Sequence, residues 1–172
     1  MRSSARDSPR TAPGDEVARL KSVRILSQDK VSETVDIRYP VTIEMEYWNF
    51  RPGARLFSGI AVFNDEGVLL FCSADIGDCE WKQPREAGCY RSRCEIPGNM
   101  FAEGIVRVLA EISTREPIYQ INVHEHDAVA FQVFDTGESG SVRSGWGRPI
   151  PGVMRPMCSW KTETMNLSVP SK

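Results

Sequence analysis

The residues best placed to do chemistry are two glutamates and a tryptophan that alternate along residues 41–50, VTIEMEYWNF. Glu44, Glu46 and Trp48 are spaced by two, and residues with this spacing point to the same face of a strand. A tryptophan ring can stack on the C–H face of a sugar, while carboxylates accept hydrogen bonds from its hydroxyl groups. This spacing therefore predicts carbohydrate binding on one face of a strand.

The same glutamate pair leaves an enzymatic alternative open. Two carboxyl groups flank the scissile bond in glycoside hydrolases, and residues two apart on one strand lie roughly 6–7 Å apart at Cα, which fits that role. The two acids of a hydrolase normally come from different elements, however, so a solvent-facing pair is favoured. The sequence has no G-x-x-x-x-G-K-[ST], G-x-S-x-G or H-E-x-x-H pattern, and we expect a protein that is not an enzyme.

Further polar residues alternate with apolar ones in three later segments, CYRSRCEI, IVRVLAE and AFQVF. If the strands formed by these segments share a sheet with residues 41–50, a polar and aromatic groove results. Ordinary solvent exposure is the alternative for each residue. The predicted glycan-binding residues are Glu44, Glu46, Trp48, Arg91, Arg93, Arg107 and Gln132.

Histidines and cysteines are the remaining candidate ligands for a metal. His124 and His126, the two histidines of the chain, would share one strand face, but no third ligand is evident and a surface pair is favoured. Four of the five cysteines, at positions 72, 79, 89 and 94, fall within 23 residues, yet no C-x-x-C pair supports a zinc site. We therefore expect reduced thiols, no metal and no cofactor.

Short alternating segments separated by turn residues must position these side chains. Such spacing, with no sustained helical period, predicts an all-β fold: an immunoglobulin-like or jelly-roll β-sandwich of two antiparallel sheets. Val41, Ile43, Met45 and Tyr47 should face the core, and Phe131 and Trp160 are also expected there. The expected strands fall within residues 17–26, 31–40, 41–50, 55–64, 68–74, 89–97, 105–113, 118–125 and 128–134.

Composition divides the chain into three parts. Residues 1–14 are rich in Arg, Ser and Pro and predict a flexible linker, and residues 162–172 predict a flexible tail, which leaves a β-sandwich domain at 15–161. The net charge of −2, without a basic run, argues against nucleic-acid binding. No apolar run approaches the ~18 residues of a membrane span, and the N-terminus lacks the apolar stretch of a signal peptide.

The order of these segments resembles the C-terminal carbohydrate-binding domain of polysaccharide-export ABC transporters of the Wzt type. The resemblance covers residues 15–161 and rests on apolar patterns: a strand, D-x-G hairpin and strand from Gly59 to Phe71, then Ile96-Pro97 followed by residues 100–104. The pattern closes with Phe131, Val133, Gly152 and Trp160. Ile105-Val106 stand in place of the usual aromatic residue. Two departures matter: no ATPase domain is present, so the sequence is either an excised domain or a separate chain, and sugar-contacting residues vary within the family, so the resemblance does not assign the site residue by residue.

The resemblance implies a non-catalytic module that recognises the terminus of a lipid-linked O-antigen polysaccharide and selects it for export. Its implied partners are the glycan, an ABC-transporter nucleotide-binding domain and a membrane subunit. The implied location is cytoplasmic, at the inner face of the inner membrane, as part of lipopolysaccharide biosynthesis. The alternative is a structural or protein-interaction β-sandwich without a sugar site.

A homodimer is also expected, in which a final strand around Met157 to Lys161 crosses to the partner sandwich. Members of the resembling family exchange that strand. Residues 137–156 are rich in Gly and Pro and form a connection longer than most within a compact domain. Such a connection can reach a neighbouring molecule, and exchange of identical elements needs no new interface chemistry. The alternative is a long surface loop that returns to its own sandwich.

Overall fold

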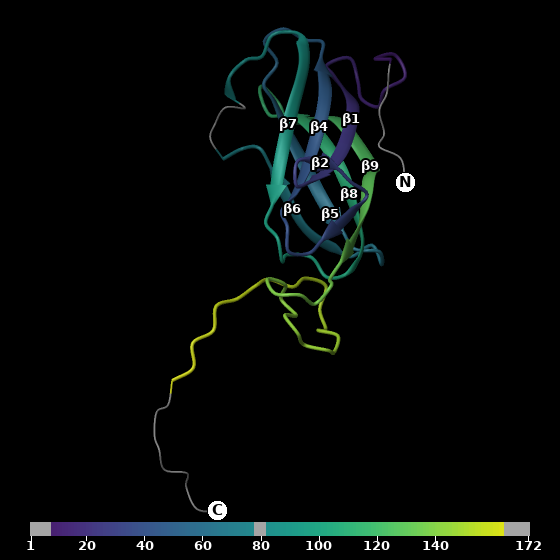
Figure 1. The fold of residues 1–172 in the computed structure, drawn as a ribbon. Helices are drawn as coiled ribbons and strands as arrows, with labels where there is room; N and C mark the ends of the chain where they lie inside the picture. The colour runs from purple at the N-terminus through teal and green to yellow at the C-terminus, as the bar shows by residue number, and fades with distance from the viewer. Residues whose placement is uncertain (1–7, 78–81, 164–172) are drawn as a thin grey trace, which may run out of the picture.

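Two β-sheets packed face to face make up the computed structural model, which describes residues 8–77 and 82–163 (Figure 1). The four-stranded sheet has the order β2-β1-β4-β7, and the five-stranded sheet has the order β3-β9-β8-β5-β6. This arrangement confirms the predicted all-β sandwich. The strands are β1 (Ala18–Ser27), β2 (Lys30–Val31), β3 (Thr34–Asp36), β4 (Val41–Asn49), β5 (Leu56–Phe63), β6 (Leu69–Ala74), β7 (Gly88–Ile96), β8 (Gly104–Thr114) and β9 (Gln120–Phe134).

Pairing within the sheets is antiparallel with one exception. β3 runs parallel to β9, with Val35 opposite Val133. β3 has only three residues and lies at the sheet edge, so this departure from the predicted antiparallel pattern is confined to a short pair. The central strands of both sheets keep long antiparallel registers, which fix the face on which each side chain lies.

The core lies between the sheets and follows the period-two pattern of the sequence. Val41, Ile43, Met45 and Tyr47 of β4 are all at most 2% exposed, as predicted. Phe131 of β9 is fully buried, also as predicted, and its ring packs edge-on against Phe101 at 5.7 Å between centroids. Burial of this apolar layer is the main stabilising term of the sandwich.

The N-terminal segment packs against the sandwich. Residues 8–14 belong to the predicted linker, yet Ala12 is buried and the Leu20 amide donates to the Pro13 carbonyl at 2.9 Å. The guanidinium of Arg19 donates to the carbonyl groups of Pro9 and Arg10. These contacts hold the described part of this segment against β1. The boundary at residue 15 stays a prediction.

The connection after β9 is folded against one end of the sandwich. Asn99 donates to the Gly140 carbonyl at 3.0 Å and accepts from the Val142 amide at 3.0 Å. The Arg155 amide donates to the Met100 carbonyl at 3.0 Å, and its side chain contacts Glu103 at 3.1 Å. Residues 137–156 are expected to be a long loop of little strand character, and side-chain and backbone hydrogen bonds account for the ordered course of this loop.

Beyond Arg155 the chain extends away from the sandwich (Figure 1). Residues 156–163 form no strand, and Trp160 is 92% exposed. The prediction of a core Trp160 is therefore wrong for the single chain, because no second layer of the same molecule faces this segment. A tryptophan can be buried only where another surface covers both sides of its ring.

Candidate functional site

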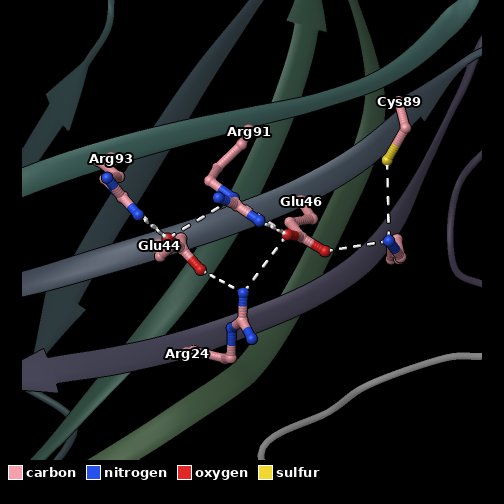
Figure 2. Close-up of polar contacts among 7 residues, drawn as sticks. Arg24, Glu44, Glu46, Cys89, Arg91 and Arg93 are labelled. Atoms are coloured by element: carbon pink, nitrogen blue, oxygen red, sulfur yellow. Dashed lines mark hydrogen bonds and ion pairs between the residues drawn. The ribbon is translucent and has the colours of Figure 1, made fainter. Parts of the chain in front are cut away.

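The outer face of the four-stranded sheet brings together six charged side chains, here called the charged face. The antiparallel register sets β4 between β1 and β7, so that Glu44 lies between Arg24 and Arg93, and Glu46 lies opposite Arg91. Figure 2 shows the arginines converging on the two carboxylates. The charged face consists of Lys21, Arg24, Glu44, Glu46, Arg91 and Arg93.

Glu44 is the buried centre of the charged face. Its side chain is 2% exposed, because guanidinium groups cover it from both neighbouring strands. Arg93 donates from Nε to Oε2 at 2.8 Å, Arg24 donates from Nη2 to Oε1, and Nε of Arg91 lies 3.6 Å from Oε2. Both carboxylate oxygens are therefore occupied, and Glu44 has no surface to offer a ligand. Its carboxylate orients the arginine side chains of both neighbouring strands.

Glu46 is also surrounded by basic side chains but is more exposed to solvent than Glu44. Arg91 donates to its Oε1 from Nη2 at 2.5 Å and from Nε at 3.0 Å. Nζ of Lys21 lies 3.1 Å from Oε2, and Nη2 of Arg24 lies 3.3 Å from Oε1. The Glu46 side chain is 13% exposed, so it also serves mainly to hold the cations in place.

The electrostatics keep both glutamates ionised. Burial alone would raise the pKa of Glu44, but hydrogen bonds from Arg93 and Arg24 hold that pKa below its usual value. The hydrogen bond from Arg91 lowers the pKa of Glu46 in spite of partial burial. A general acid for glycoside cleavage needs a raised pKa so that it carries a proton near neutral pH. The glutamate pair is therefore unsuited to the proton-donating step of the enzymatic alternative.

Cations outnumber anions on the charged face. Four basic and two acidic side chains give a formal charge of +2, although the whole chain carries −2. The side chains of Arg91 and Arg93 are 52% and 58% exposed. Within the described residues, neither arginine's Nη1 has a hydrogen-bond acceptor. This surface can therefore donate hydrogen bonds to an anionic or hydroxyl-rich ligand.

Trp48 lies at the end of the same face. Its neighbours in register are Arg19 of β1 and Cys89 of β7, and its side chain is half-buried. Tyr47 is fully buried on the opposite face, which confirms the predicted orientation of β4. The tryptophan ring therefore borders the charged face, at a position where it can contact a ligand held by the arginines.

Two predicted residues lie elsewhere. Arg107 of β8 and Gln132 of β9 belong to the five-stranded sheet, so the expectation of one groove shared with residues 41–50 is wrong. Arg107 forms an ion pair with Asp127 at 3.4 Å, and the Gln132 amide donates to the Val133 carbonyl. Period-two alternation indicates the face of a strand on which a residue lies, but it does not indicate which sheet the strand joins.

Two residues of the charged face could not be identified from period-two alternation in the sequence. Lys21 and Arg24 are three residues apart in β1. The register shifts between Leu20 and Ser22, and this β-bulge brings both cations to the outer face. A bulge adds one residue to a strand and reverses the alternation beyond it. The basic pair in VARLKSVRIL is the signal that could have suggested their role.

The candidate metal ligands do not form a group of three among the described residues. The rings of His124 and His126 are in edge contact at 4.7 Å between centroids, and Glu111 lies 3.3 Å from Nδ1 of His124. Over residues 8–77 and 82–163, no three His, Cys, Asp or Glu side chains are grouped to hold a metal. Cys72, Cys89, Cys94 and Cys158 are free thiols, and Cys79 lies outside the described residues.

Replacement of Glu44 by glutamine should destabilise the fold by about 1–2 kcal/mol at pH 7. This is less than the ~3–5 kcal/mol for a fully buried ion pair, because the arginines are partly exposed. Since the folded-state pKa is lowered, the stabilisation is complete above the usual value of 4.5 and is lost as pH falls through the folded-state pKa. Denaturant unfolding at pH 7 and pH 3 measures both effects.

Glu95, an exposed glutamate on β7, supplies the matched control for this substitution. Glu95→Gln should leave the free energy of unfolding within about 0.5 kcal/mol of the native chain at both pH values. Equal stability of Glu44→Gln and the native chain at pH 7 would show that the charge of Glu44 contributes nothing to the stability of the fold.

Comparison with known proteins gives a match in structure alone. No protein-family model matches the sequence, and no curated protein is similar to it in sequence. Among solved structures, the fold is similar to that of the C-terminal domain of Wzt, with a TM-score of 0.70 and 12% sequence identity. The match covers 94% of this chain and 93% of that chain. The chain therefore has the fold of that domain over nearly its whole length.

Proposed function

We propose that the chain is a non-catalytic domain that binds the terminus of a lipid-linked O-antigen polysaccharide and selects it for export by an ABC transporter. The observation that carries this proposal is the charged face, where two half-exposed arginines and Trp48 border one another on a sheet of the Wzt C-terminal fold. Arginine forks and an aromatic ring are the side chains that protein sites use to hold and orient sugars.

The charge of the site narrows the class of glycan. With an excess of two positive charges, the charged face favours a polysaccharide with a carboxylate, phosphate or sulfate group near its terminus. The guanidinium groups of Arg91 and Arg93 are already oriented by Glu46 and Glu44. Because these side chains are ordered before the ligand binds, less conformational entropy is lost on binding. We expect affinity to fall as salt concentration rises.

The partners follow from the same proposal. A selecting domain has to work beside an ABC-transporter nucleotide-binding domain and a membrane subunit, on the cytoplasmic side of the inner membrane. The described part of the chain contains no helix long and apolar enough to cross a membrane.

The test is retention of glycan without cleavage. The purified chain, incubated with a set of acidic and neutral O-polysaccharides, should retain an acidic member in affinity electrophoresis and release no new reducing ends. Trp48→Ala should weaken retention about tenfold, as loss of one stacking contact of ~1.4 kcal/mol would do. Release of shorter sugars would favour the enzymatic alternative. A chain that retains no polysaccharide would favour a structural sandwich.

A further inference from the structure

We propose that the outer face of the five-stranded sheet carries a second saccharide site, which takes an uncharged stretch of an oligosaccharide. This sheet lies behind β1 and β4 in the view of Figure 1, so its outer face points away from the charged face. Two neighbouring hollows, of about 340 and 330 Å³, are lined from this sheet and share Leu109. Each is within the ~300–1,000 Å³ range of ligand clefts.

The shape of the hollows comes from β5. Phe57, Gly59, Ala61 and Phe63 follow one another at a spacing of two, so they share the outer face. Gly59 and Ala61 have almost no side chain, whereas the phenylalanines at either end stand taller. The sheet surface is therefore low between two aromatic walls, and Leu109 of β8 lies opposite Ala61 in this low region.

Polar groups converge on one side of the low region. Glu111 of β8 lies opposite Gly59, and its carboxylate accepts hydrogen bonds from Ser113 Oγ at 2.6 Å and Tyr119 Oη at 3.0 Å. Nδ1 of His124 lies 3.3 Å from the other carboxylate oxygen. The Glu111 side chain remains 22% exposed. A carboxylate, an imidazole and a phenol hydroxyl so arranged can exchange hydrogen bonds with vicinal sugar hydroxyl groups.

Tyr119 adds an exposed ring beside these polar groups. Its side chain belongs to a residue that is 54% exposed, and its ring centroid lies 6.5 Å from that of Phe57. The ring is held at two points, by contact with Phe57 and by the hydrogen bond to Glu111. A held, exposed aromatic ring next to hydrogen-bonding groups is suited to stacking against the C–H face of a pyranose.

The charges of this groove argue against an acidic ligand and favour neutral hydroxyl groups, which can donate hydrogen bonds to its carboxylates. Arg107 is paired with Asp127 at 3.4 Å in the second hollow, which Asp65 and Glu66 also line, and Glu111 is the anion of the first. Carboxylates therefore outnumber the one arginine along the groove. No excess of cations corresponds to that of the charged face, so an acidic sugar would gain nothing here. The mixture of rings and hydroxyl-binding groups also distinguishes the groove from a purely apolar surface that another protein would cover.

The test is binding of neutral sugars to the full chain, followed residue by residue. A panel of uncharged hexasaccharides of glucose, galactose, mannose and rhamnose is titrated while backbone amide chemical shifts are recorded. We expect saturable shifts for at least one member, centred on Gly59, Ala61 and Glu111. Failure of the whole panel, or shifts confined to the charged face, would overturn the second site.

Two variants make the test specific. Tyr119→Ala removes the exposed ring, and Gly59→Val fills the low region. A Cβ at Gly59 meets its nearest atom at 3.7 Å, an ordinary contact, so the valine should fold normally and direct its methyl groups into the groove. Both variants should weaken binding of the neutral sugar at least tenfold, whereas Ile118→Ala, at a 79% exposed neighbour of Tyr119, should leave it unchanged.

The experiments can contradict the proposed second site without contradicting the proposed glycan site at the charged face, and the reverse is also true. Gly59→Val should still retain an acidic polysaccharide, because Gly59 belongs to the other sheet. If Gly59→Val binds the neutral sugar as the native chain does, the groove is not its site. If instead the variant changes only the molecular mass in solution, the face is a contact between protein chains and the second site is wrong.

Discussion

Substitution of both Arg91 and Arg93 by alanine is expected to abolish retention of an acidic polysaccharide. These two side chains carry the half-exposed guanidinium groups of the charged face, at 52% and 58% exposure. A hydrogen bond to a charged group contributes about 1.5–3 kcal/mol, which is about a tenfold to hundredfold change in affinity for each arginine. Loss of both should bring a weak sugar interaction below detection in a titration calorimeter.

The double substitution also removes support from Glu44, so binding and folding must be separated. Arg91→Lys combined with Arg93→Lys keeps the charge beside the two glutamates but loses the planar fork of donors. The free energy of unfolding of this variant should lie within about 1 kcal/mol of that of the native chain. The variant should still bind the acidic polysaccharide at least tenfold more weakly. Arg55→Ala is the matched control, because Arg55 is likewise paired with a glutamate, Glu116, but lies outside the charged face.

Three outcomes would count against an acidic polysaccharide bound at the charged face. Native affinity in the double alanine variant would show that the polysaccharide binds elsewhere on the chain. Equal loss of affinity in Arg55→Ala would show that the effect comes from overall charge and not from this surface. Unchanged affinity between low and high salt would contradict the proposed acidic ligand, because exposed charge interactions are screened by ions.

The sequence pattern was sufficient to predict the β-sandwich fold and the orientation of the side chains along one strand of the candidate site, β4. Strict alternation in residues 41–50 predicted that Tyr47 is buried and that Glu44, Glu46 and Trp48 share the other face, and the structure agrees. Such patterns are reliable because a slip of one residue would expose the whole apolar set. The hairpin at residues 64–68 was equally predictable, since Gly67 has the positive φ of 79° that glycine adopts readily.

Long-range arrangement was not predictable from the same pattern. The sheet to which β8 and β9 belong depends on pairing between distant segments, so Arg107 and Gln132 were placed with the wrong strands. The β-bulge at Lys21 depends on local backbone geometry and concealed two cations of the charged face. Burial of Glu44 is a further example, because its 2% exposure results from arginines of two other strands.

Deletion of residues 156–172 is expected to convert a homodimer into a monomer. We propose that the part of this segment around Met157 to Lys161 crosses to the partner molecule as the exchanged strand. In the single chain, residues 156–163 contact no second layer, and Met157 and Trp160 are 56% and 92% exposed. Apolar side chains left this exposed are stabilised by burial at an interface, at about 25 cal/mol for each Å².

The structure indicates where the exchanged segment should begin. Arg155 is fixed to its own sandwich through Glu103 and the Met100 carbonyl, and it also donates to the Ile150 carbonyl of the connection, so the chain is held up to Arg155. On the receiving molecule, β6 and β7 are the open edges on one side of the sandwich, because each pairs with a single strand among the described residues. An added strand would cover such an edge and satisfy its backbone groups.

Light scattering of the full chain and of residues 1–155 at micromolar concentration tests this assembly. Burial of one tryptophan removes ~150–250 Å² from water, so Trp160→Ala should raise the dimer dissociation constant at least a hundredfold. Trp146→Ala is the control, because Trp146 is 59% exposed in the segment that stays on its own sandwich. A monomeric full chain, or a truncated chain that remains dimeric, would refute strand exchange, since in either case residues 156–172 would not hold two molecules together.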